Sequence, residues 1–223
     1  VLIPAALQRP ATESEGLEGD LAGDLDEEDL DKTPTHKNTG STEVGDSHPV
    51  LRSLRLTACI SSQVGCAMAC KFCLTGIQGL DRHLETYEIV TQVFELRRLA
   101  PVTNIVFMGM GEPLMNYPNV MKAIEMITST EGLSMSPKRI TVSTSGVSKM
   151  IKKMADDNVK FKLAVSLHSA IDTTRSRIMP FTENFPLADL RESLEYWYRK
   201  TKSKISYEYV IWKDINDNKA SID

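Results

Sequence analysis

The feature that most restricts the fold of this sequence is an alternation of short apolar segments with amphipathic ones beyond residue 54. Alternation of this kind predicts βαβ units built on a parallel sheet. The five expected strands are too few to close an eight-stranded barrel, so we expect an α/β fold with an open, partial TIM-type barrel. The expected strands are 54–62, 104–108, 139–142, 162–165 and 204–212, and the expected helices are 87–99, 117–130, 147–156, 173–178 and 187–201.

Four of the expected strands are followed at once by residues with distinctive chemistry. A cysteine-rich segment follows the first strand, GMGEP (109–113) the second, STSG (143–146) the third and SLH (166–168) the fourth. In α/β barrels, functional residues collect at the C-terminal ends of the strands. The sequence therefore predicts a single site on one rim of the partial barrel.

The cysteine-rich segment carries Cys66, Cys70 and Cys73 in CxxxCxxC spacing. Thiolates bind soft metals, and iron–sulfur clusters usually take four of them. Three cysteines would leave one iron open to a small ligand that offers an amine and a carboxylate, and S-adenosylmethionine carries both. The aromatic Phe72 before the last cysteine is typical of radical S-adenosylmethionine enzymes. We therefore expect a four-iron four-sulfur (4Fe-4S) cluster with S-adenosylmethionine.

Other interpretations of the cysteines stay open. The three thiolates and His83 would suit a zinc-stabilised binding module without catalysis, although zinc ribbons usually show two separated ligand pairs. Disulfides are disfavoured because the sequence shows no secretory signal. Cys59 lies outside the triplet, and it is either a small buried hydrophobe or a thiol that acts on a covalent intermediate.

The other strand-end motifs also allow two readings each. Glu112, on a glycine-rich turn, would engage the ammonium group of a ligand or cap a helix. Ser143 and Ser145 would offer hydroxyls to a ligand or cap the following helix. Ser166 and His168 lie at the end of the next strand, and their place in the series favours contact with a ligand.

Charge is distributed unevenly along the chain. Residues 13–46 hold twelve acidic side chains and two lysines, whereas the remaining residues hold 24 basic and 18 acidic ones. The segment 13–49 is too polar to bury a core, so we expect a disordered acidic insertion there. It would separate an N-terminal strand or hairpin remnant, 1–12, from the partial barrel, 50–223. The basic balance of the barrel suits an RNA partner, and no apolar run is long enough for a membrane span.

The stretch CISSQVGCAMACKFC (59–73), followed by GMGEP, STSG, SLH and YEYVI (207–211), resembles the radical S-adenosylmethionine adenine methyltransferases of large-subunit rRNA and tRNA. These are the RlmN-type enzymes, to which the Cfr-type resistance enzymes are related. The similarity runs from about residue 55 to 217 and includes 1–4, but not the acidic segment. It implies a radical SAM core with the cluster on the three cysteines. It implies contacts to S-adenosylmethionine from Gly111, Glu112, Ser143, Ser166, Leu167 and His168.

The resemblance also implies a reaction, methylation of carbon 2 of an adenosine in large-subunit rRNA, with tRNA as a second candidate. In the family, a cleaved S-adenosylmethionine yields a deoxyadenosyl radical, which activates a methyl group carried on a C-terminal cysteine. Cys59 matches the cysteine that resolves the resulting protein–RNA crosslink. We further expect an electron donor such as flavodoxin, a monomer without a membrane partner, and a cytoplasmic location, or an organellar one in a eukaryote.

Three family features lie outside this sequence. The methyl-carrying cysteine and a late cofactor-contacting asparagine would follow Asp223, so Asn216 is not that asparagine. The general-base glutamate would precede Val1. We therefore expect an N- and C-terminally truncated fragment that binds cluster and cofactor but does not methylate RNA. A radical enzyme acting on a peptide or a small molecule is the alternative within the same chemistry.

Overall fold

The computed structural model of the protein describes residues 2–4 and 55–221, so the acidic insertion expected at 13–49 lies outside the described residues. The main sheet has six strands in the order β1-β2-β5-β6-β7-β8. Its strands are β1 (Leu2–Pro4), β2 (Leu56–Cys59), β5 (Asn104–Phe107), β6 (Ile140–Thr144), β7 (Lys162–Ser166) and β8 (Ile205–Glu208).

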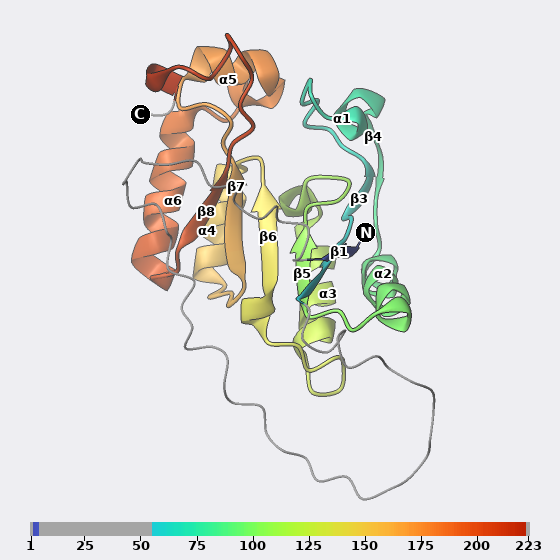
Figure 1. Cartoon of the computed structure of the whole chain (residues 1–223). Coiled ribbons are helices and arrows are strands. Elements are labelled where there is room, and N and C mark those ends of the chain that lie inside the picture. Colours follow the sequence, from blue (N-terminus) through green and yellow to red (C-terminus); the bar gives the residue numbers. More distant parts are fainter. Residues whose placement is uncertain (1, 5–54, 222–223) are drawn as a thin grey trace, which may run out of the picture.

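The main sheet has five parallel strands, which pair in the order β2, β5, β6, β7 and β8. β1 pairs antiparallel with β2 and forms one edge of the sheet, while β8 forms the other (Figure 1). The parallel strands therefore direct their C-terminal ends toward the same rim. The predicted α/β fold with an open, partial barrel is confirmed.

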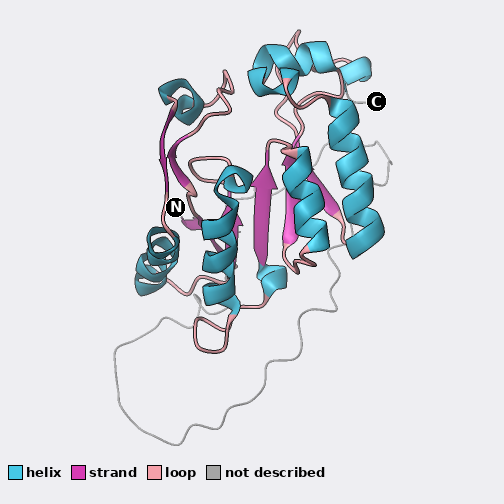
Figure 2. Cartoon of the chain, turned by 180° about the vertical axis from the view of Figure 1, so that it is seen from behind, coloured by secondary structure: helices cyan, strands magenta, loops and turns pink. Residues whose placement is uncertain are grey.

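Amphipathic helices cover one face of this sheet, as Figure 2 shows. The connecting helices are α2 (Thr86–Leu99), α3 (Tyr117–Thr128), α4 (Ser148–Asp156), α5 (Asp172–Ile178) and α6 (Leu187–Thr201). α5 differs from the others because it lies at the C-terminal rim of the strands (Figure 1). Among the described residues, no helix has both the length and the apolar character needed to cross a membrane.

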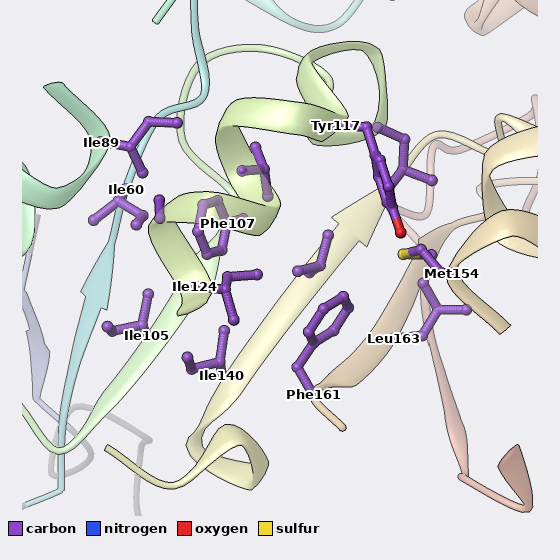
Figure 3. Close-up of a cluster of buried hydrophobic side chains, with 14 of the residues drawn as sticks. Ile60, Ile89, Ile105, Phe107, Tyr117, Ile124, Ile140, Met154, Phe161 and Leu163 are labelled. Atoms are coloured by element: carbon purple, nitrogen blue, oxygen red, sulfur yellow. The ribbon is translucent and has the colours of Figure 1, made fainter. Parts of the chain in front are cut away.

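The larger of the two hydrophobic clusters formed by the described residues lies between the sheet and its helices. Ile105 and Phe107 alternate with half-buried residues along β5, as expected for side chains that point to opposite faces of a strand. They meet the helical stripe of α3, which includes Ile124 (Figure 3). Burying a large apolar side chain contributes roughly 1.5–3 kcal/mol, so this core holds the rim in place.

One element of the fold was not predicted. The cysteine segment is enclosed by a separate hairpin of β3 (Gln63–Gly65) and β4 (Leu80–His83), with the short helix α1 (Leu74–Gln78) between the two strands. All four residues of β4 are exposed, so the segment has no alternation of polar and apolar residues from which a strand could be recognised.

The last expected strand, 204–212, is shorter than predicted. β8 ends at Glu208, because the backbone N–H of Val210 donates to Nδ1 of His168, 3.1 Å away, rather than to a neighbouring strand. Two residues later, the N–H of Trp212 donates to Oδ1 of Asn216 at 2.6 Å. Side-chain acceptors therefore bend this segment over the rim, although its sequence has strand character.

Asn116 fastens the cysteine hairpin to the body of the fold. Its buried Nδ2 donates to the carbonyl oxygens of Ser62 and Leu84, both at 2.8 Å. These two residues directly precede β3 and follow β4. One amide therefore holds both strands of the hairpin.

We predict that Asn116→Ala lowers the free energy of unfolding by about 2 kcal/mol, because the buried carbonyl oxygen of Leu84 loses its side-chain donor and that of Ser62 keeps only the N–H of Leu84. Urea denaturation followed by circular dichroism measures this change. Asn184→Ala, at an exposed position, is the matched control and should change stability by less than about 0.5 kcal/mol. Equal stability of the two variants would show that Asn116 does not anchor the hairpin.

Candidate active site

The C-terminal ends of β5, β6, β7 and β8 surround a pocket of about 130 Å³. GMGEP and STSG supply most of its lining, and Ser166 and Glu208 complete it. Three of the four predicted motifs thus meet at one place. The third residue of SLH, His168, does not line this pocket.

Glu112 is buried and joins two of the motifs. Its Oε1 accepts the N–H of Leu114 at 3.0 Å, and its Oε2 accepts the N–H of Ser145 at 2.7 Å. Burial raises the pKa of this carboxyl group above its usual value. The bond to Leu114 is the predicted helix cap, and the bond to Ser145 ties GMGEP to STSG. The hydroxyls of Thr144 and Ser145 also bind this carboxylate, so four protein donors share its two oxygens.

Gly111 is required by its backbone conformation. Its φ is +99°, and a Cβ atom there would lie 2.5 Å from Cβ of Gln63. The side-chain Oε1 of Gln63 also accepts the N–H of Glu112 at 2.7 Å. The glycine therefore allows β3 of the cysteine hairpin to pack directly against the GMGEP turn.

Ser143 and Ser166 point toward the same carboxylate. Their Oγ atoms lie 3.5 and 3.2 Å from Oε2 of Glu208. The alternative of Ser143 as a helix cap is wrong, since Oγ1 of Thr144 accepts the N–H groups of Gly146 and Val147 instead. Glu208 itself was not predicted as a site residue, although it lies within the YEYVI motif at a strand end, where such residues are expected.

His168 is not among the residues that line the pocket. It is buried, and its Nδ1 accepts the N–H of Val210. Burial, together with the nearby charge of Arg175, lowers the pKa of His168 to about 4. Its ring meets Phe72 and Trp212 edge-on, with centroids 5.0 and 5.9 Å away. A neutral imidazole thus packs the end of β7 against the cysteine loop.

Arg175 is a fully buried cation that sequence reasoning missed. Its guanidinium donates to the carbonyl oxygens of Leu167 (3.0 Å), Ser166 (3.1 Å) and Ser145 (2.6 Å), and also to Oγ1 of Thr182 (3.0 Å). Burial lowers its pKa to about 10, which still leaves it charged at neutral pH. The only sequence signal was an arginine in a short helix, which ordinarily indicates an exposed residue.

The cysteine loop docks onto the same helix. The N–H of Lys71 donates to the carbonyl oxygen of Ile178 at 2.9 Å, and Cys70 is buried with Met68 against Met179. Gly65 closes the hairpin beneath the loop. Its φ is +79°, and a Cβ atom there would lie 2.0 Å from the carbonyl oxygen of Gly79, so no other residue fits.

The three cysteines are close enough to affect one another's ionisation. Burial, with the charges of Cys66 and Cys73 as smaller causes, raises the pKa of Cys70 to about 12. Burial likewise raises the pKa of Cys66. With these raised pKa values, the thiols of Cys66 and Cys70 would lose their protons only against strong positive charge, which iron ions supply.

The described donors do not form a ready site for a single zinc ion. In the part of the chain that the structure describes, no three His, Cys, Asp or Glu side chains converge as ligands of a single ion. Nδ1 of His83, the proposed fourth zinc ligand, lies 2.9 Å from Nε2 of Gln63. Thiolates on three corners of an iron–sulfur cube bind different irons, so they need not converge on one point.

Cys59 occupies the last position of β2, apart from the triplet in sequence. It is half-buried, and burial raises the pKa of its thiol, with a smaller contribution from the charge of Glu208. None of the four described cysteines forms a disulfide. Because its pKa is raised, the thiol of Cys59 is protonated at neutral pH, and it lies close enough to the carboxylate of Glu208 to feel its charge.

Comparisons with known proteins agree with this geometry. Residues 60–221 match the model of the Radical SAM superfamily. A "Probable dual-specificity RNA methyltransferase RlmN" from Flavobacterium johnsoniae is 67% identical over 175 residues, which cover 76% of this chain and 50% of the relative. A relative of the same name from Salinibacter ruber is 42% identical over 224 residues, which cover 96% of this chain and 61% of the relative.

A solved structure is also similar. The crystal structure of a radical SAM methyltransferase from Sphaerobacter thermophilus has a TM-score of 0.72 and 38% identity, over 78% of this chain and 52% of that one. The chain spans about half the length of the curated relatives named above. The resemblance to RlmN-type enzymes expected from the sequence motifs is confirmed.

We predict that Arg175→Met destabilises the protein by about 2–4 kcal/mol, because three carbonyl oxygens lose their buried donor. Arg175→Lys should recover part of this loss, since a lysine restores the charge but not the planar fork. Chemical denaturation measures both variants against Arg199→Met, an exposed control on α6 that should cost less than about 0.5 kcal/mol. If the Met and Lys variants were as stable as the control, Arg175 would not organise the rim.

Proposed function

We propose that this chain, which belongs to the radical SAM superfamily, forms the cofactor-binding core of an RlmN-type RNA adenine methyltransferase. Superfamily membership brings a 4Fe-4S cluster and S-adenosylmethionine as cofactors. The observation that carries the proposal is the meeting of the cysteine hairpin, GMGEP and STSG at one rim, in a chain 42–67% identical to two relatives of that name.

The chain's own residues divide the work of binding. Cys66, Cys70 and Cys73 would hold the cluster, which when bound supplies the electron that cleaves S-adenosylmethionine. Gly111 and Glu112 would receive the cofactor at one side of the pocket, with the Ser143 and Ser166 hydroxyls at the other. Leu167 and His168 remain predicted contacts, and their observed bonds support the rim from behind.

The substrate we propose is an adenosine of large-subunit rRNA, methylated at carbon 2, with tRNA as a second candidate. An aromatic carbon of this kind is a poor nucleophile, which explains the need for radical chemistry. Cys59 would act as the thiol that resolves a covalent protein–RNA intermediate. An electron donor such as flavodoxin, a monomeric state and a cytoplasmic or organellar location complete the proposal.

Cluster binding can be tested by substitution of single cysteines. After anaerobic reconstitution we expect about four irons per chain and broad visible absorption, both lost in Cys70→Ala. Cys59→Ala is the matched control, because this thiol lies on β2 and not in the cysteine loop, and it should retain the iron. A colourless protein with stoichiometric zinc would contradict the proposal, and so would equal loss of iron in both variants.

RNA as the substrate class can be tested by binding. The reconstituted protein should bind an rRNA fragment with an affinity that falls as salt rises, because phosphate contacts release counterions. Lys71→Glu changes an exposed side chain in the cysteine loop and should weaken binding several-fold with a lower salt slope. Lys149→Glu, exposed on α4, is the control and should have little effect.

Failure of the RNA test has a defined meaning. If the wild-type protein loads its cluster and binds S-adenosylmethionine but shows no salt-dependent affinity for RNA, a radical enzyme acting on a peptide or a small molecule is favoured. If Lys71→Glu and Lys149→Glu weaken RNA binding equally, the contact is a general effect of charge and does not involve the rim.

A further inference from the structure

The strands β6, β7 and β8 turn one face toward the helices and the other face outward, toward the viewer of Figure 1. Leu163 belongs to the larger hydrophobic cluster on the helix side, and Ile205 packs against that cluster. Because successive side chains of a strand point to opposite faces, the residues that alternate with these two lie on the outward face. They are Lys162, Ala164 and Ser166 on β7, and Lys204, Ser206 and Glu208 on β8 and at its entry.

Two lysines lie side by side at the N-terminal end of this outward face. Leu163 and Ile205 are partners in the parallel register, so Lys162 and Lys204, one residue earlier on each strand, are neighbours as well. Adjacent strands lie only about 4.8 Å apart. Both lysine side chains are exposed, and neither forms an ion pair within the described part of the chain. Like charges opposite each other on neighbouring strands are destabilising, so an anionic ligand would relieve a cost that the fold itself leaves in place.

A short strip of the same face connects the lysine pair with the pocket at the rim. The next partners along the two strands are Ala164 and Ser206, and the pair after them is Ser166 and Glu208, which line the pocket. Four residues separate Lys204 from Glu208, which corresponds to about 13 Å along a strand. Because Ala164 and Ser206 have small side chains, a ligand that lies on this strip meets no bulky side chain of β7 or β8 between the lysines and the pocket.

The charges along the strip fit a nucleic-acid strand that has one base at the pocket. The carboxylate of Glu208 repels a phosphate from the rim, whereas two ammonium groups at the other end attract one. A lysine binds phosphate as a point charge and needs no fixed geometry, which suits a flexible backbone. A ligand confined to the pocket would not reach the lysines, so the partner must be a longer polyanion.

We propose that Lys162 and Lys204 form a phosphate-binding pair for the substrate RNA and hold its backbone a few nucleotides away from the adenosine at the rim. This inference rests on the proposed function, because it adds a second contact surface for the RNA named there.

The first test neutralises both lysines in one variant, Lys162→Gln/Lys204→Gln. Binding of the cluster-reconstituted protein with S-adenosylmethionine to a labelled polyuridine strand with one central adenosine is measured anaerobically by fluorescence anisotropy over a range of salt concentrations. The variant should bind about tenfold more weakly at low salt, and its slope of log affinity against log salt should fall by about 1.4, since each single-strand phosphate contact contributes about 0.7. Lys149→Gln/Arg199→Gln removes the same charge from exposed positions on α4 and α6 and should leave the slope unchanged.

Neutral linkages locate the contact on the RNA. In a series of strands, a methylphosphonate replaces one phosphate at a time, beginning at the adenosine and moving outward. The wild-type protein should lose affinity at one or two linkages that lie a few nucleotides from the adenosine. The Lys162→Gln/Lys204→Gln variant should show no further loss at those linkages, because groups in contact have non-additive effects.

The outcomes separate this inference from the proposed function. The inference is overturned if the slope of the lysine variant falls no further than that of the control, or if the same linkages remain sensitive in the lysine variant. It is also overturned if polyglutamate binds as tightly as the RNA and is weakened equally in the lysine variant, since the pair would then be a general polyanion surface. A wild-type protein that loads its cluster and binds S-adenosylmethionine but has no salt-dependent affinity for RNA would instead refute the RNA substrate of the proposed function.

Discussion

The buried guanidinium of Arg175 is the interaction on which the rim depends. It binds the carbonyl oxygen of Ser145, while the N–H of the same residue is bound by the buried carboxylate of Glu112. The backbone of Ser145 therefore links the buried guanidinium of Arg175 to the buried carboxylate of Glu112. Each charge would be costly to bury by itself, and together they fix the ends of β6 and β7 relative to the GMGEP turn.

The position of this cation also suits the chemistry of the cysteine loop. Arg175 lies on α5, against which the loop packs, and its charge lowers the pKa of Cys70 against the larger effect of burial. A cluster held by three thiolates adds negative charge at a partly buried place. A permanently charged guanidinium nearby, already saturated with carbonyl partners, offsets part of that charge without competing for the thiolates as ligands.

The sequence predicted the parallel strands, the helices and the rim because each depends on local periodicity and on residues at strand ends. It did not predict the hairpin of β3 and β4, whose exposed residues carry no periodic signal. It placed His168 in the site by its strand-end position and by the family resemblance, and in the structure the His168 ring packs against Phe72 and Trp212. Arg175 was missed because its partners are backbone oxygens brought together only by the folded sheet.

Glu208 shows why a strand-end rule identifies a site better than it assigns roles. The rule selects every polar residue at the rim, but register decides which of them share a face, and Ser143, Ser166 and Glu208 do. Glu112 lies across the pocket with its oxygens bound by backbone N–H groups. The two carboxylates therefore differ in their partners: the hydroxyls of Thr144 and Ser145 add to the backbone donors of Glu112, whereas Ser143 and Ser166 face Glu208.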